Sequence, residues 1–136
     1  MSNLPKITAF FTAYAAKDVS AIRGVMADDI IWRFPGHHPL AGEHRGIAEV
    51  LALFDQMASA GFQSQPIVTA ESGDYIVDHH RAWSTAGSGL DLTWCVVYHF
   101  RDGKVSEASH FCSDQHRADR FFHELLHLKP IPERLA

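Results

Sequence analysis

The sequence predicts an α+β domain in which a cone-shaped, curled sheet, mixed but mostly antiparallel, wraps around N-terminal helices. Apolar residues first recur every three or four positions, and from about Gln65 onward they alternate with polar residues. Helices therefore precede strands along the chain, which is typical of the α+β class. Three amphipathic helices need one concave face to cover, so we expect long strands that curl and leave a cavity at their open end.

The first half of the chain contains three expected helices and one expected strand. The first helix spans residues 7–16, and Asp18 is placed to cap a second over residues 19–26. A strand over residues 30–34 ends at Pro35-Gly36, and a turn-rich loop leads to Gly46. A third helix follows, with Gly61 suited to the position just past its end.

The second half of the chain is expected to form a meander of strands and one last helix. The strands are predicted over residues 66–71, 75–85, 90–101 and 104–113, separated by glycine-containing turns. Asp114 is the expected N-cap of the last helix, which Pro130 and Pro132 end.

Composition narrows the classes of function. With 136 residues, 46% hydrophobic and 21% charged, the chain is expected to be one globular domain over residues 1–136. A formal net charge of −4 and the lack of a basic run argue against nucleic acid and anionic membrane surfaces as partners. No signal peptide or membrane-spanning segment is apparent, and two cysteines are no disulfide framework. We therefore expect a cytoplasmic protein.

Ten histidines raise the question of a metal site. His37-His38 and His79-His80 are adjacent pairs, and on a strand adjacent residues face opposite sides. His123 and His127 are four residues apart but have no third ligand beside them in the sequence. We expect no bound metal and no cofactor.

One segment carries a family resemblance. Residues 35–46 read Pro-Gly-His-His-Pro-Leu-Ala-Gly-Glu-His-Arg-Gly, and the helix–helix–strand–loop–helix order around them, together with residues 90–92, 100–105 and 114–115, resembles the SnoaL-like branch of the nuclear transport factor 2-like superfamily. The resemblance implies a cystatin-like α+β barrel with an apolar pocket. That superfamily hosts isomerases, dehydratases, cyclases, hydrolases and binding domains, so the fold alone implies no reaction.

The resemblance also bears on individual site positions. Matched to the ketosteroid isomerase branch, the base, tyrosine and acid positions fall at Phe34, Phe10 and near Val96, so that site chemistry is not expected. Matched to SnoaL-like polyketide cyclases, the acid/base aspartate on the last strand falls at His110. A histidine can transfer protons near neutral pH.

The register of the last two strands decides whether His110 faces the cavity. A one-residue glycine bulge in the turn over residues 101–103 pairs Val96 near Ala108 and puts Trp94, Val96, Tyr98, His110 and Cys112 on the cavity face. With a plain two-residue turn, His110 instead shares a face with Cys95 and Val97. We favour the bulge. The other expected cavity residues are Tyr14, Trp32, Phe34, His38, His79 and Trp83.

Two kinds of function remain open. The first is an isomerase, cyclase or dehydratase that acts on a carbonyl compound without metal, with His110 as acid or base and His79 or Tyr14 holding the developing oxyanion. The second is a non-catalytic ligand-binding or accessory domain. Either would bind a small apolar or aromatic ligand. We also expect a homodimer formed through the outer sheet face, where Cys95, Val97 and Phe111 are too apolar for open water.

Overall fold

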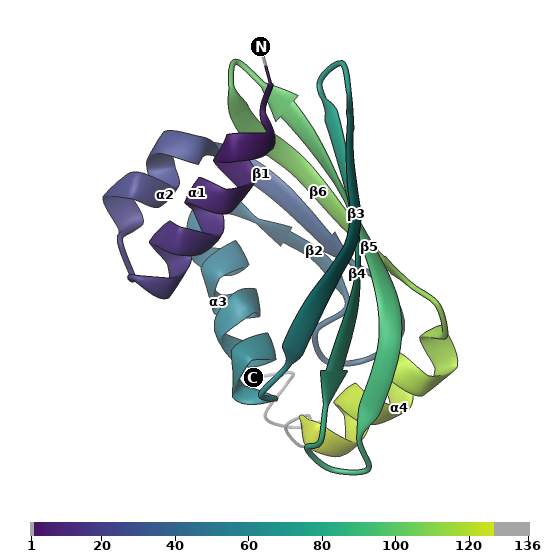
Figure 1. The fold of residues 1–136 in the computed structure, drawn as a ribbon. Coiled ribbons are helices and arrows are strands. Elements are labelled where there is room, and N and C mark those ends of the chain that lie inside the picture. The colour runs from purple at the N-terminus through teal and green to yellow at the C-terminus, as the bar shows by residue number, and fades with distance from the viewer. Residues whose placement is uncertain (1, 127–136) are drawn as a thin grey trace.

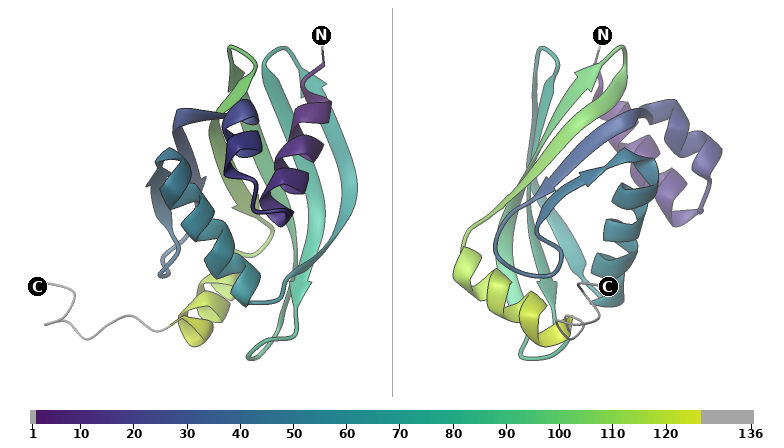
Figure 2. Two further views of the ribbon diagram at one scale, coloured as in Figure 1. Left: turned by 90° about the vertical axis from the view of Figure 1, so that its left-hand side faces the viewer. Right: turned by 180° about the vertical axis from the view of Figure 1, so that it is seen from behind.

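The computed structural model describes residues 2–126 and confirms the α+β class. Within that range, three helices precede most of a curled, unclosed six-stranded sheet and a fourth follows it (Figure 1). The first three helices lie on the concave side of the sheet, and the fourth lies across the end where β4 finishes and β5 begins (Figure 2). The helices therefore leave part of the concave face uncovered.

The helices are α1 (Leu4–Ala15), α2 (Val19–Val25), α3 (Gly46–Ser59) and α4 (Gln115–Leu125). Asp18 and Asp114 cap α2 and α4 as predicted, because each side chain accepts a hydrogen bond from the backbone N–H three residues ahead. Gly61 follows α3 with a φ of 67°, a left-handed conformation that glycine adopts without strain.

The strands are β1 (Met26–Phe34), β2 (Gly42–Arg45), β3 (Gln63–Ser72), β4 (Tyr75–Ser84), β5 (Leu90–Arg101) and β6 (Lys104–Cys112). Their order across the sheet is β2-β1-β6-β5-β4-β3. All neighbours are antiparallel except β1 and β6, which pair in parallel as the second and third strands of that order. The sheet is therefore mixed but mostly antiparallel, as predicted.

Several boundaries differ from the prediction. Part of the expected loop after β1 forms the short strand β2, which pairs with β1 from Ile31↔Arg45 to Phe34↔Gly42. Strand β3 begins at Gln63 rather than Pro66, because the polar residues before the proline pair with β4. Pro130, Pro132 and His127 lie outside the described residues.

The register of β5 and β6 places His110 on the predicted face of the sheet. The bulge that sets this register, however, does not lie in the turn, where it was expected. The turn is a plain two-residue one, since Arg101 pairs with Lys104 across Asp102 and Gly103. The register then shifts by one residue between His99 and Phe100, opposite Ser106. The buried Ser106 hydroxyl donates to the His99 carbonyl at 3.1 Å, which holds the bulge in place. The predicted pairing of Val96 near Ala108 is therefore wrong by two residues, since Val96 pairs with His110 and Ala108 with Tyr98. A shift of two residues leaves the facing unchanged, so His110 lies on the concave side, as predicted.

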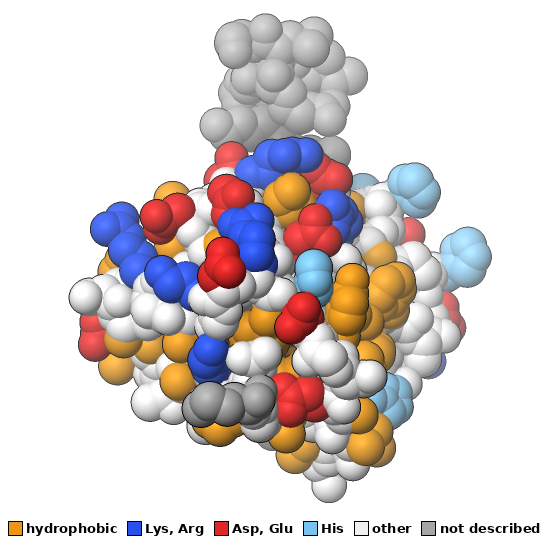
Figure 3. Space-filling view, turned by 90° about the horizontal axis from the view of Figure 1, so that it is seen from above, with side chains coloured by type: hydrophobic (Ala, Val, Ile, Leu, Met, Phe, Trp, Pro, Cys, Tyr) orange, Lys and Arg blue, Asp and Glu red, His pale blue; other side chains and the backbone are white. Residues whose placement is uncertain are grey.

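The concave face and the helices share one apolar core, which contains Trp32, Ile76, Tyr98 and Phe122. On the end of the molecule that carries the β5–β6 turn, basic and acidic side chains are interspersed rather than gathered by sign (Figure 3). Within residues 2–126, no helix is both long and apolar enough to cross a membrane.

Candidate ligand cavity on the concave face

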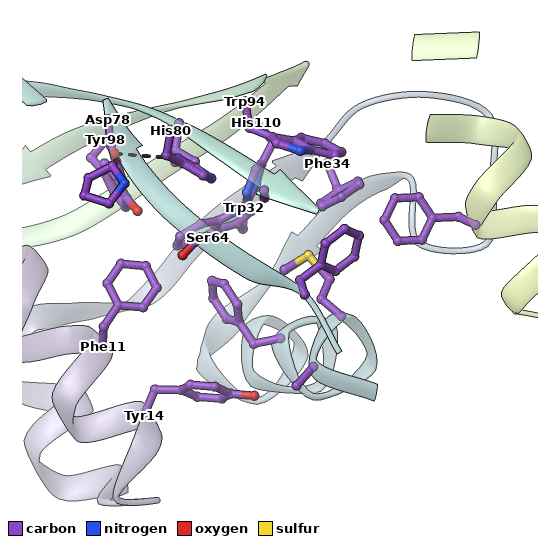
Figure 4. Close-up of a pocket in the computed structure, with 18 residues that line it drawn as sticks. Phe11, Tyr14, Trp32, Phe34, Ser64, Asp78, His80, Trp94, Tyr98 and His110 are labelled. Carbon is purple, nitrogen blue, oxygen red and sulfur yellow. Dashed lines mark hydrogen bonds and ion pairs between the residues drawn. The ribbon is translucent and has the colours of Figure 1, made fainter. Parts of the chain in front are cut away.

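A cavity of about 430 Å³ opens between the concave sheet face and helices α1 and α3. This volume lies within the usual range for small-molecule sites. The helical side consists of apolar and aromatic side chains: Phe11, Tyr14, Phe54, Met57 and Ala58. The sheet side carries the polar groups, and Figure 4 shows several of them facing the cavity.

Strand register explains which sheet residues line the cavity. Asp78, Val96 and His110 lie in one row across β4, β5 and β6. Neighbouring strands are about 4.8 Å apart, so the backbones at the two ends of this row are on the order of 10 Å apart. Because Val96 is small, the Asp78 carboxylate and the His110 imidazole project on either side of it. A ligand above Val96 would meet both groups.

His110 is held as a neutral imidazole of one tautomer. The indole Nε1–H of Trp32 donates to His110 Nδ1 at 2.8 Å, so Nε2 carries the ring proton. The surface that His110 retains faces the cavity, and removal from bulk water lowers its pKa to about 3. The nearby His80 lowers the pKa further, whereas Asp78 opposes the shift. His110 thus offers the cavity an N–H donor.

Asp78 and His80 form a second polar group on the same face, both from β4. His80 Nδ1 lies 3.6 Å from an Asp78 carboxylate oxygen, and the two side chains are 19% and 20% exposed. This distance is too long for a hydrogen bond. The pair therefore places an imidazole and a carboxylate side by side on the wall of a largely apolar cavity.

Two further polar atoms of the lining have no partner among the described residues. These are Trp94 Nε1 and the Tyr98 hydroxyl, whose residues are only 4% and 1% exposed. Burial, and then the negative charge of Asp78, raise the pKa of Tyr98, so its hydroxyl stays protonated. His80 Nδ1 also has no hydrogen bond.

Of the residues expected from sequence to line the cavity, seven do: Tyr14, Trp32, Phe34, Trp94, Val96, Tyr98 and His110. The Tyr14 hydroxyl, however, donates to Asp55 at 2.8 Å. Burial and Asp55 raise the pKa of Tyr14 to about 12. Tyr14 therefore contributes its ring to the lining, while its hydroxyl is engaged within the protein.

His79 and Trp83 were expected on the cavity face, and this expectation is wrong. His80 pairs with Trp94, so His79 faces the opposite side and its Nδ1 lies 3.0 Å from the Trp94 carbonyl oxygen. Trp83 lies beneath the Arg81 guanidinium, 4.2 Å from it. The error comes from the strand end, since β4 stops at Ser84 and not at Thr85, which shifts the pairing with β5 by one residue.

His38 and Cys112 also lie outside the lining. His38 is buried against Phe122, with its ring nitrogens 2.9 Å from the Pro35 carbonyl oxygen and 3.1 Å from the Leu40 N–H. The Cys112 thiol is 3.3 Å from Gln115 Oε1 in α4, which begins just beyond it. Both residues therefore hold the structure around the cavity instead of facing it.

Sequence reasoning missed Asp78 and His80. The alternation along β4 does not indicate which face of the strand is directed to the cavity, because both faces carry apolar residues. Ile76 and Ala82 lie on one face, and Val77 and Trp83 lie on the other. The sequence carries no local signal for the facing, because β4 ends through a tertiary contact: the Ser84 hydroxyl donates to the Ala60 carbonyl and accepts from the Ala86 N–H. Among the described residues, no group of three or more His, Cys, Asp or Glu side chains is arranged to hold a metal ion.

Comparison with known proteins identifies the family. Residues 7–108 match the SnoaL-like domain, so the chain belongs to the SnoaL-like family. The uncharacterized protein Rv0034 of Mycobacterium tuberculosis is 25% identical over 126 residues, covering 89% of this chain and 96% of that protein. A nuclear transport factor 2-like protein from Burkholderia xenovorans is 28% identical with a TM-score of 0.72, covering 86% and 95%. TerC, co-crystallized with polyporic acid, shares the fold at 20% identity and a TM-score of 0.71, covering 88% and 96%.

Proposed function

We propose that this protein is an enzyme that moves a proton on an uncharged carbonyl compound, as isomerases and aldol-type cyclases do. The observation that carries the proposal is the row Asp78–Val96–His110, with His80 beside it, on the wall of one apolar cavity. A proton acceptor and a fixed N–H donor then flank the same ligand position. That combination suits removal of a proton next to a carbonyl group.

The roles follow from the state of each group. The imidazole of His80 accepts the α-proton, and the Asp78 carboxylate 3.6 Å away stabilises the imidazolium that forms. The electron pair of the broken C–H bond moves to the carbonyl oxygen, which becomes an enolate oxygen. His110 Nε2–H donates to that oxygen. This replaces the sequence-based hypothesis of His110 as the base, because its lowered pKa and the Trp32 hydrogen bond favour a donor.

The proposal is tested with the enolisable fused-ring ketone 1-tetralone. In D₂O, proton NMR follows the exchange of its C2 protons for deuterium. We expect the wild-type protein to accelerate exchange and Asp78→Asn to slow it about 10- to 100-fold, since interactions with a charged group contribute about 1.5–3 kcal/mol. If 1-tetralone binds but its exchange rate equals that of the buffer, the catalytic proposal fails.

A non-catalytic ligand-binding domain is the alternative function. It is favoured by the bond between Trp32 and His110, which engages one ring nitrogen within the protein. Binding of 1-tetralone without exchange would support it. Loss of exchange in Asp78→Asn, with retained binding, would contradict it.

We also propose that the protein forms a homodimer through its outer sheet face. Phe111 is 54% exposed there, and Cys95 and Val97 are half-buried beside it. Tyr75 and Val77 extend this apolar face onto β4. An apolar patch of this kind is costly to leave in water.

A further inference from the structure

Asp78 carries the only acidic side chain among the described residues that line the cavity, and none of those residues is a lysine or an arginine. The side chain is 20% exposed, and its contact with His80 Nδ1, at 3.6 Å, is too long for a hydrogen bond. Within residues 2–126 the carboxylate accepts no hydrogen bond, yet its oxygen atoms keep surface that is open to the cavity. The described part of the fold therefore leaves an acceptor in the cavity without a donor.

A carboxylate in this position describes the group that would complement it. Removal of a charge from water without a donor or an opposite charge costs free energy. An ionised carboxylate can only accept hydrogen bonds, so the matching ligand atom is a donor. A donor that carries a positive charge forms the shorter and stronger bond, and it also balances the charge of Asp78 in surroundings of low polarity.

The walls of the cavity also favour a cation. Phe11 and Tyr14 from α1 face the sheet across the cavity (Figure 4), and Phe54 from α3 adds a third ring. The faces of aromatic rings attract cations, and their area covers the apolar part of a ligand. Because His110 offers an N–H donor on the other side of Val96, positive charge is favoured only at the Asp78 end.

We infer that the cavity binds an organic amine, whose ammonium group donates to the Asp78 carboxylate and whose apolar body lies against the aromatic walls. This inference goes beyond the proposed function, because an amine without a carbonyl group binds with no proton transfer. Such an amine occupies the place of the carbonyl compound. It therefore competes with that compound for the cavity.

The test uses two ligands of the same shape that differ in charge: 3-phenylpropylamine, whose amino group is protonated at pH 7, and 3-phenylpropan-1-ol, which is uncharged. NMR titration of the protein gives the dissociation constant of each ligand, and hence an affinity ratio. For the wild type we expect the amine to bind about 10- to 100-fold more tightly, the usual contribution of a hydrogen bond to a charged group. Asp78→Asn should bring the ratio close to one, because asparagine keeps the size of the side chain and removes its charge.

The matched control is Asp74→Asn, the same substitution at an exposed position just before β4. It removes one negative charge from the protein outside the cavity, so the ratio should keep its wild-type value. Equal losses in the two variants would trace the preference to the overall charge of the protein and overturn the inference. An amine that fails to bind at millimolar concentration, or a ratio that survives Asp78→Asn, would overturn it as well.

Thermal unfolding of the free protein separates ligand recognition from a structural role of Asp78. If the carboxylate lacks a partner until a ligand binds, Asp78→Asn should raise the Tm of the free protein by about 2–5 °C. Added 3-phenylpropylamine should raise the Tm of the wild type more than that of Asp78→Asn. A lowered Tm in the free variant, together with an unchanged affinity ratio, would assign the carboxylate to the fold and contradict the inference.

Exchange of 1-tetralone reports on the proposed function separately. If exchange is absent, the affinity ratio still tests the binding of the amine, so either proposal can fail without the other. If exchange occurs, 3-phenylpropylamine should inhibit it competitively. Binding of the amine without such inhibition would place it outside the cavity and overturn the inference.

Discussion

The two faces of strand β4 differ more than the sequence of that strand suggests. On the concave face, Ile76 is completely buried and Asp78 and His80 line an apolar cavity. On the convex face, Val77 is 37% exposed and His79 lies against the backbone of β5. Residues of similar type, one position apart, thus line a cavity on one side and an outer surface on the other. The face of the strand on which a residue lies, and not the type of residue, therefore decides its chemical role here.

The comparison is tested most strongly by the two adjacent histidines. We expect His80→Gln to slow 1-tetralone exchange about 10²- to 10⁴-fold, the usual contribution of a positioned acid or base. His79→Gln, on the opposite face, should leave the rate within about twofold. Proton NMR in D₂O measures both variants. Equal losses in the two would mean that parity does not separate their roles.

The next test compares the packing of the two faces. Ile76→Ala should lower the free energy of unfolding by about 2–5 kcal/mol, since it empties a fully enclosed position in the core. Val77→Ala should cost less than about 1 kcal/mol, because its side chain already contacts water. Urea denaturation gives both values. A similar cost for both variants in the monomer would contradict the assignment of the faces.

The position of His110 on the cavity wall, away from bulk water, predicts a dependence of stability on pH. Its folded pKa, about 3, lies below the unfolded value near 6.5, so between these values the unfolded chain binds the extra proton. Stability should therefore fall as pH falls through this window, by up to about 1.4 kcal/mol per pH unit from this group. His38, whose pKa burial also lowers, acts in the same direction.

The contribution of His110 is isolated by comparing the wild type with His110→Gln between pH 3 and 6.5. Urea denaturation at each pH gives the free energy of unfolding. This free energy should change less steeply with pH in the variant than in the wild type. Because His38 is present in both proteins, its effect cancels in the difference. Parallel slopes would show that His110 titrates normally in the folded protein.

A substitution on the outer sheet face is expected to affect the cavity least. Phe111→Lys places a charge among the convex apolar residues, where Phe111 is 54% exposed. We expect sedimentation to show a dimer for the wild type and a monomer for the variant, while 1-tetralone exchange per chain changes by less than about twofold. A wild-type protein that remains monomeric at high micromolar concentration would contradict the proposed dimer.

Sequence periodicity determined much of the fold. The change from helical to alternating patterns identified the helices and most strands, and the capping residues Asp18 and Asp114 marked two helix starts. These signals are local, because a helix face or a cap involves residues a few positions apart. For the same reason, the aromatic lining residues of β1 and β5 were correctly placed within the cavity.

Only the tertiary structure decided which residues of β4 face the cavity. The alternation of a strand has a period of two, so a shift of one residue exchanges its faces completely. In β4 that shift depends on Ser84, whose hydroxyl donates to the carbonyl of Ala60, the residue just after α3, and ends the strand one residue earlier than predicted. In β6 the facing of His110 depends on a bulge at Ser106. Both are long-range or irregular features that local periodicity does not encode, and they decide which side chains face the cavity.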